Sequence, residues 1–314
     1  MNCKLAVAPK FTKWEPSTIF SDTPLDKFAL VILNRELQLP ISVYSRLWAN
    51  AVYKVAADGG ANRLYDLNKN TCNNISDNAS PPFLHLNCIV GDLDSLRPDS
   101  RAYWVQQKVP IIHYPEQDST DFAKAVYHIR NHFIGQHENK EEENQKSIDI
   151  VVLGDLSGRI DHAMSILHNL YTLQEKVDEE NEYLAGRLYL VSSEAITFML
   201  QAGTHKVEME NLERNQLFNH NNNQNSHINN IKDNNDLVKI NKHVGIIPLK
   251  ESSIISTLGL QWDVANWETQ FGGQISTSNY IINNVVSIQT SKDILITLEL
   301  DILSHQDETQ HIIH

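Results

Sequence analysis

Five mostly apolar runs, each followed by a turn and then a helix-like pattern, constrain the fold of this chain more than any other feature. Runs that are apolar on both faces are typical of strands buried in a parallel sheet, and they span residues 28–33, 53–57, 86–90, 110–114 and 148–153. Their alternation with helices indicates βαβ units, and a sixth apolar segment, residues 187–200, is expected to close the sheet. The sequence therefore predicts an α/β fold whose N-terminal, Rossmann-like domain covers residues 1–201.

From residue 202 the pattern changes to short strand-like runs separated by turns, without helical periodicity. Such spacing is typical of an antiparallel β-sandwich, predicted here over residues 202–314. An asparagine-rich stretch, residues 219–241, holds too little apolar surface to pack and is predicted to be a disordered insertion. Because so small a β domain buries little of its surface, we expect the chain to form a homodimer.

Composition excludes several classes of protein. The net charge of -13 argues against nucleic acid or an anionic membrane as a partner and favours a small ligand. No apolar leader or stretch of transmembrane length is present, so we expect a cytoplasmic protein. The three cysteines, Cys3, Cys72 and Cys88, are scattered and suit a reducing compartment, without a disulfide framework or a zinc site.

Acidic turns follow the predicted strands at four places. They contain Asp58, then Asp92 and Asp94, then Asp121, and finally Asp155 and Asp161. In a parallel sheet such turns meet at the carboxyl edge, where ligands bind. Gathered carboxylates repel one another unless cations lie among them, and hard oxygen ligands suit Mg²⁺ carrying a nucleotide polyphosphate. The predicted helix that carries Phe122 and Val126 is expected to be capped by Asp118 or Ser119.

The segment Gly154-Asp-Leu-Ser-Gly158-Arg159-Ile-Asp161-His162 has the richest chemistry. Its glycines free the loop, the following helix offers unpaired N–H groups to phosphate, and Arg159 can clamp phosphate oxygens. The plainer alternative is a structural ion pair of Arg159 with Asp161 or Asp155, with His162 a packed or exposed helix residue. There is no P-loop motif, so phosphate chemistry here depends on carboxylates, metal and Arg159.

Other motifs are weak when taken alone. A D-x-D pair such as Asp92 and Asp94 also occurs as a cap in surface loops, and the Asp58-Gly-Gly turn needs no ligand to explain it. His128 and His132 have the spacing of a helical metal pair, but they lack an accompanying acid and are more simply surface histidines.

Taken together and in order, the motifs resemble those of the thiamine pyrophosphokinases, specifically the eukaryotic, fungal-type enzymes. The matching segments are residues 57–66 (ADGGANRLYD), 91–95 (GDLDS), 116–125 (EQDSTDFAKA), 154–162 (GDLSGRIDH), 245–249 (GIIPL), 256–262 (STLGLQW) and 275–279 (ISTSN). The chain departs from the family at Asp155 and Ser157, where a small residue or glycine is expected, and in its long insertion.

The resemblance implies transfer of the terminal pyrophosphoryl group of ATP to thiamine, giving thiamine diphosphate and AMP. It implies that Asp92, Asp94 and Asp121 hold Mg²⁺, and that Asp58 and Asp161 complete the acidic cluster. By the same resemblance, Gln117, Thr120 and Arg159 orient the ATP phosphates, and Asp121 or Asp161 accepts the proton of the thiamine hydroxyl. In the β domain it implies that Trp262, Ser276 and Ser278 bind thiamine, although Trp262 could instead be a core residue. The family resemblance also implies a homodimer with the active sites at the interface.

Two other functions remain open at this stage. A regulator could bind thiamine or thiamine diphosphate without catalysis, but it would be expected to lose some of the acids. A metal-dependent nucleotide-sugar transferase also uses a D-x-D motif.

Overall fold

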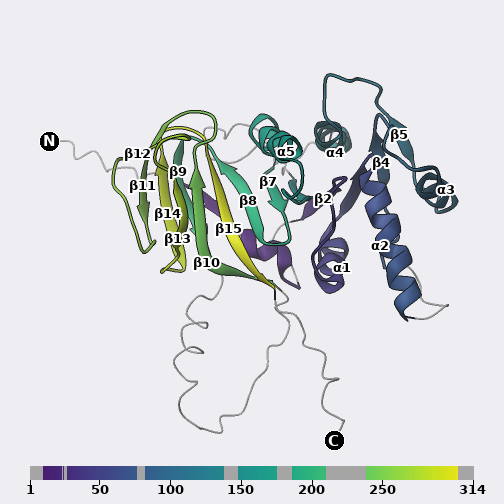
Figure 1. Ribbon diagram of the computed structural model, residues 1–314, viewed down its shortest axis with the longest axis horizontal. Helices are drawn as coiled ribbons and strands as arrows, with labels where there is room; N and C mark the ends of the chain where they lie inside the picture. Colours follow the sequence, from purple (N-terminus) through teal and green to yellow (C-terminus); the bar gives the residue numbers. More distant parts are fainter. Residues whose placement is uncertain are drawn as a thin grey trace, which may run out of the picture.

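The computed structural model describes residues 10–22, 24, 27–75, 82–137, 148–174, 186–209 and 238–302 (Figure 1). A ten-stranded sheet runs through the molecule in the order β13-β10-β15-β8-β7-β6-β2-β3-β4-β5. One half of this sheet is parallel and the other half is antiparallel. A second, five-stranded sheet packs on the antiparallel half.

The parallel half contains the strands that the apolar runs predict. They are β2 (Phe28–Ile32), β3 (Tyr53–Ala57), β4 (Cys88–Gly91), β5 (Ile111–His113), β6 (Asp149–Leu153) and β7 (Leu188–Val191). The chain moves outward from β2 to β5 and then returns to place β6 on the other side of β2. The connection after β2 therefore leads toward one edge of the sheet and the connection after β6 leads toward the other. Open α/β sheets form a ligand crevice at such a point, outside the carboxyl ends of the two strands.

Helices cover both faces of the parallel half, and this explains why its strands are apolar throughout. Leu30 and Ile32 of β2 face one core, together with residues of α1 (Ile41–Asn50), α2 (Gly60–Ile75) and α3 (Pro98–Gln106). Ala29 and Val31 face the opposite core, with α4 (Asp121–His137) and α5 (Ile160–Leu173). Alternate residues of one strand thus fill two different cores.

The apolar segment at residues 187–200 forms two strands rather than one. It turns back after β7 into β8 (Ala195–Leu200), which runs antiparallel to β7. The antiparallel half continues with β15 (Ile294–Ile302), β10 (Val238–Ile247) and the edge strand β13 (Ser276–Tyr280). Because β8 precedes residue 202 and pairs with β15, the two predicted domains share one continuous sheet.

The second sheet completes the predicted sandwich. Its order is β1 (Thr12–Trp14), β9 (Gly203–Glu208), β14 (Val285–Thr290), β11 (Ser253–Leu258) and β12 (Trp267–Thr269). The short β1, followed by a 3-10 turn at Pro16–Phe20, pairs parallel to β9 although the other ladders of this sheet are antiparallel. Trp14 is fully buried and stacks on Phe198 of β8 with ring centroids 4.6 Å apart, so it joins the two sheets.

The predicted disordered insertion falls mostly outside the described residues. Its last four residues, 238–241, are an exception, because they open β10 and lie beside the end of β15. Val238 and Ile240 alternate with polar residues and are buried, which is the period-two pattern of a strand. Among the described residues, none of the helices combines the length and apolar character that crossing a bilayer requires.

Candidate active site

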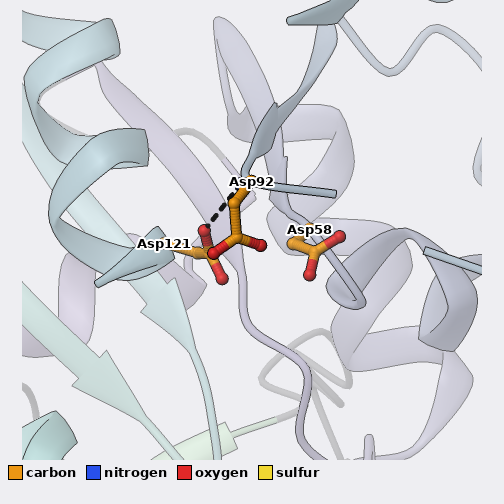
Figure 2. Close-up of side chains that lie close together, drawn as sticks. All are labelled: Asp58, Asp92 and Asp121. Carbon is orange, nitrogen blue, oxygen red and sulfur yellow. Dashed lines mark hydrogen bonds between the residues drawn. The ribbon is translucent and has the colours of Figure 1, made fainter. Parts of the chain in front are cut away.

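The fold brings three of the predicted acids together at the carboxyl edge of the parallel strands. Asp58 follows β3, Asp92 follows β4, and Asp121 opens α4. One carboxylate oxygen from each lies within 4.8 Å of the others, and Figure 2 shows the three side chains converging. Three hard oxygen donors at this spacing can hold a divalent cation such as Mg²⁺.

Short backbone contacts fix the positions of these acids. The Asp92 N–H donates to Asp121 Oδ1 at 3.2 Å, and the Ser95 N–H donates to Asp58 Oδ2 at 3.0 Å. Gly91 lies between them: a Cβ at this position would be 2.8 Å from the Cβ of Asp58 and 2.9 Å from Asp121 Oδ1. A side chain at residue 91 would therefore force the acids apart, which explains the glycine that ends β4.

The environment of the acids favours a bound cation. Asp58 is 2% exposed, and its Oδ1 is buried without a hydrogen-bond partner. Burial is the main cause that raises the pKa of Asp58 to about 6; repulsion from Asp121, Asp94 and Asp92 adds to it, while the Ser95 N–H opposes it. Burial also raises the pKa of Asp121. An unpaired, buried carboxylate oxygen in an acidic cluster costs free energy that a metal ion would offset, so the residues present fit one.

Lys124 is a member of the site that the sequence analysis missed. Its side chain is only 3% exposed, and its Nζ lies 3.4 Å from Asp121 Oδ1 and 3.6 Å from Asp92 Oδ2. The available signal was its position three residues after Asp121, which puts both on one face of α4. Its ammonium group neutralises part of the acidic charge in the absence of a metal.

Asp94 and Gln117 lie at the exposed side of the cluster. Asp94 is exposed, accepts a hydrogen bond from its neighbour Ser95 Oγ at 2.8 Å, and is not one of the three acids that converge. Gln117 Nε2 donates to Asp92 Oδ2 at 3.4 Å. The converging set thus contains Asp58 together with Asp92 and Asp121.

Thr120, rather than Asp118 or Ser119, caps α4. Its Oγ1 accepts the Ala123 N–H at 3.1 Å and donates to Asn169 Oδ1 at 2.9 Å. The expectation of a cap at residues 118–119 was wrong because the helix begins at Asp121, which makes Thr120 the N-cap position. The hydroxyl of Thr120 therefore links the beginning of α4 to α5.

Arg159 and Asp161 form the ion pair that was the plainer alternative for this segment. Arg159 Nε and Nη2 donate to the two carboxylate oxygens of Asp161 at 3.1 and 2.6 Å, and both side chains are exposed. The Arg159 guanidinium lowers the pKa of Asp161. Asp161 thus stands apart from the three converging acids. His162 is exposed at the start of α5, as the plainer reading expected.

The histidines of α4 lie away from the acids. His128 and His132 pack beside Tyr53 at the beginning of β3, with the Tyr53 and His132 ring centroids 4.2 Å apart and Tyr53 Oη 3.2 Å from His128 Nε2. They are half-buried rather than exposed. Among the described residues, they do not join a cluster of three possible metal ligands.

A pocket of about 270 Å³ opens between the free edges of the two sheets of the sandwich. It is lined by residues of β10, β11, β12 and β13 and the loop between β11 and β12: Ile246, Ile255, Thr257, Trp262, Val264, Trp267, Ile275, Ser276, Thr277 and Asn279. Trp262 is 55% exposed and is held beside Tyr280, so it is not a core residue. Ser276 lines the pocket, whereas Ser278 is exposed, has a φ of 57° and is not among the lining residues.

The acids and this pocket lie far apart within one chain. In the order of the long sheet, β13 is separated from β3 by seven strand spacings. At about 4.8 Å for each spacing, the path along the sheet from β13 to β3 is roughly 30 Å long. Figure 1 shows β11 and β12 at one end of the molecule and β4 at the other.

Comparisons with known proteins match both halves of the chain. Residues 44–180 match the family model described as the catalytic domain of thiamin pyrophosphokinase, and residues 227–295 match the one described as its vitamin B1 binding domain. Thiamine pyrophosphokinase 1 of Arabidopsis thaliana is 30% identical over 287 residues, which cover 90% of this chain and 91% of the relative. Thiamine pyrophosphokinase of Saccharomyces cerevisiae is 29% identical and covers 86% of this chain and 85% of its own length.

Solved structures match the fold along nearly the same length. The crystal structure of yeast thiamin pyrophosphokinase has a TM-score of 0.70 at 26% identity, covering 92% of this chain and 91% of that one. Thiamin pyrophosphokinase from Candida albicans has a TM-score of 0.67 at 24% identity and covers 95% of both chains. The α/β domain followed by a β-sandwich is therefore confirmed.

Proposed function

This chain belongs to the thiamine pyrophosphokinase family, and on that premise we propose that its acidic cluster binds the ATP phosphates while its sandwich pocket binds thiamine. The enzyme transfers a pyrophosphoryl group from ATP to thiamine, giving thiamine diphosphate and AMP. In this proposal residues 1–201 carry the catalytic work and residues 202–314 bind thiamine. Asp58 Oδ1, buried and without a partner beside two other carboxylates, is the single observation that carries the assignment of the cluster.

We assign Mg²⁺ to Asp58, Asp92 and Asp121, because their oxygens converge. When bound, the ion would neutralise charge on the phosphates, which is the main requirement of phosphoryl-type transfer. Asp94 lies on the same loop at the solvent side, where its charge still favours a hydrated cation. Gln117, which already contacts Asp92, and Arg159 are assigned to the phosphate oxygens. Thr120 holds α4 and α5 in register beside them.

The thiamine site is assigned to the sandwich pocket. An exposed tryptophan at the pocket wall suits a planar, cationic ligand, because aromatic faces attract cations. Ser276 lines the same pocket and offers a hydroxyl, and Ser278 lies two residues along β13. This supports Trp262 and Ser276 as direct contacts and Ser278 as part of the rim.

We further propose a homodimer in which each active site combines the acids of one subunit with the pocket of its partner. The support is the separation of roughly 30 Å across the sheet, which a ligand as small as thiamine cannot span. Exposed apolar side chains at and beyond the pocket, Ile275 in its lining and Phe271 beside α5, give the second copy a surface to cover. We also propose a cytoplasmic enzyme, and the net charge of -13 argues against nucleic acid or an anionic membrane as its partner.

One assay tests the function directly. Purified protein is incubated with Mg-ATP and thiamine, and AMP and thiamine diphosphate are separated by chromatography. We expect the two products in equal amounts, with none when thiamine is omitted. The Asp92→Asn variant is the matched control and is expected to lose at least a hundredfold in rate, because an electrostatic element of the site is removed. Thiamine binding without any AMP would instead identify a regulator.

A further inference from the structure

The turn after β2 carries an arginine that the acid chemistry does not use. Arg35 is half-buried and lies just beyond the carboxyl end of β2, whose neighbour in the sheet is β6. Its Nε donates to the carbonyl oxygen of Asp155 at 2.9 Å, and its Nη1 lies 3.4 Å from His162 Nδ1. This single side chain therefore contacts both the beginning of the loop at residues 155–159, which joins β6 to α5, and the first turn of α5.

The guanidinium also lies beside Gly158, near the end of this loop. A Cβ added at Gly158, whose φ is +83°, would be 3.4 Å from Arg35 Nη2, which is van der Waals contact distance. Residues 155–159 form neither helix nor strand, so backbone ladders do not hold them. Side-chain contacts must hold the loop in one conformation.

Asp155 secures the beginning of the same loop. Its Oδ1 accepts the Ser157 N–H at 2.6 Å, and its Oδ2 accepts a hydrogen bond from Ser193 Oγ at 2.9 Å. Burial alone would raise the pKa of Asp155, but the hydrogen bonds from Ser157 and Ser193 outweigh it and lower the pKa. Asp155 and Ser157 are the two positions where this chain departs from the small residues expected from the family resemblance. Arg35 binds the backbone carbonyl of the first of them, Asp155.

We propose that Arg35 is a positioning residue for pyrophosphoryl transfer, fixing the loop at residues 155–159 so that Arg159 is presented to the ATP phosphates. The inference rests on the proposed function of the site. Without Arg35 the loop samples other conformations, and ATP binds only the fraction of molecules in the competent one. The apparent affinity for ATP is then the intrinsic affinity multiplied by that fraction, while turnover at saturating ATP is retained.

The kinetic test compares Arg35→Gln with the parent enzyme. Losing a hydrogen bond from a charged donor corresponds to about a tenfold effect, so the KM for ATP is expected to rise about tenfold, with kcat changed less than about twofold. The KM for thiamine is expected to stay unchanged. Arg35→Lys keeps the charge but not the second donor arm, so an intermediate KM for ATP is expected. Arg101→Gln, at an exposed arginine of α3, is the matched control and should match the parent.

Hydrogen exchange tests the loop independently of activity. In the absence of ATP, peptides covering residues 155–159 should exchange faster in Arg35→Gln than in the parent, while peptides of β3 and β4 should not change. If the parent releases no AMP from ATP in the presence of thiamine, the proposed function fails, and exchange together with equilibrium dialysis of Mg-ATP still decides whether Arg35 supports ATP binding. An unchanged affinity for ATP, with or without faster exchange, overturns the proposal. A fall in kcat at unchanged KM for both substrates overturns it as well.

Discussion

Three carboxylates and one ammonium group form the centre of the site, and their charges do not balance. Asp58, Asp92 and Asp121 converge on a small volume, and Lys124 contacts the last two but not Asp58. The unbalanced charge therefore rests mainly on Asp58, whose pKa is raised. A divalent cation bound among the three acids would offset this unfavourable charge.

Asp58→Asn is expected to stabilise the metal-free protein and to weaken metal binding. An asparagine Oδ1 can still accept the Ser95 N–H, while the buried charge is removed. A pKa raised to about 6 corresponds to an ionised form destabilised by about 3 kcal/mol at neutral pH. Urea unfolding in EDTA should show an increase of that order in the free energy of unfolding, and Mn²⁺ titration should show at least a tenfold loss of affinity.

Asp94→Asn is the matched control for this pair of measurements. Asp94 is exposed and lies two residues from Asp92, so its replacement should change the free energy of unfolding by less than about 0.5 kcal/mol. Equal stabilisation by both variants would show that the general negative charge, rather than the burial of Asp58, is responsible.

Metal affinity is expected to fall as the pH drops below about 6. The folded-state pKa of Asp58 lies above its ordinary value, so a proton competes with the metal for this carboxylate at mildly acidic pH. In the apo protein the same shift has the opposite consequence: the contribution of Asp58 to stability is present at low pH and is lost as the pH rises through about 6. Calorimetric Mn²⁺ titrations at pH 5, 6 and 7.5 should show about a tenfold loss per pH unit below 6. If the Asp58→Asn variant showed the same pH dependence of Mn²⁺ affinity, the protonation of Asp58 could not be its cause.

At the scale of elements, the turn that ends β4 determines whether the acids can converge. Gly91→Ala would place a methyl group against Asp58 and Asp121, which belong to different elements and cannot both move aside. We expect a loss of about 1–3 kcal/mol in the free energy of unfolding and a loss of metal binding beyond that of Asp58→Asn. Thermal unfolding and Mn²⁺ titration measure both. Gly273→Ala, where the added Cβ meets nothing closer than 3.4 Å, should leave both nearly unchanged.

The elements that the sequence predicted are those whose pattern is local. The parallel strands and the acidic turns follow from apolar runs and motifs that lie within a few residues of one another. The sequence did not predict β1, because its three residues form a strand only by pairing with β9, far along the chain. It treated residues 187–200 as one segment, although Ser192, Ser193 and Glu194 interrupt the apolar run and form the reversal between β7 and β8.

The same limit applies to the site. Asp58, Asp92 and Asp121 are marked by their acidic turns, whereas Lys124 lies in the matching segment 116–125 without being singled out and Arg35 lies outside all of the matching segments. Lysine and arginine are mostly exposed in proteins, so nothing in the sequence marked Lys124 as nearly buried. Arg35 acts on a loop 120 residues away, a contact that only the neighbouring positions of β2 and β6 create.

At the scale of the whole molecule, the separation between acids and pocket makes a prediction about assembly. The two sites lie seven strand spacings apart, from β13 to β3, in the same sheet. In the proposed two-fold dimer the pocket of each subunit would meet the acids of the other, and both sites would form together. Light scattering is expected to give the mass of a dimer, and dilution below its dissociation constant should abolish activity.

Subunit complementation tests the shared site directly. Asp92→Asn removes a member of the acidic cluster, and Trp262→Ala removes the pocket wall, so each variant alone is expected to be nearly inactive. When the two variants are unfolded and refolded together, mixed dimers have one site with both lesions and one site with neither. If random pairing makes half of the dimers mixed, about a quarter of the parental activity should return.

Trp262 is 55% exposed, so its replacement should leave the fold intact. Mixing Asp92→Asn with Asp58→Asn is the matched control, since both lesions fall in the same cluster and no complete site can form. Continued inactivity of confirmed mixed dimers would mean that each chain builds its own site.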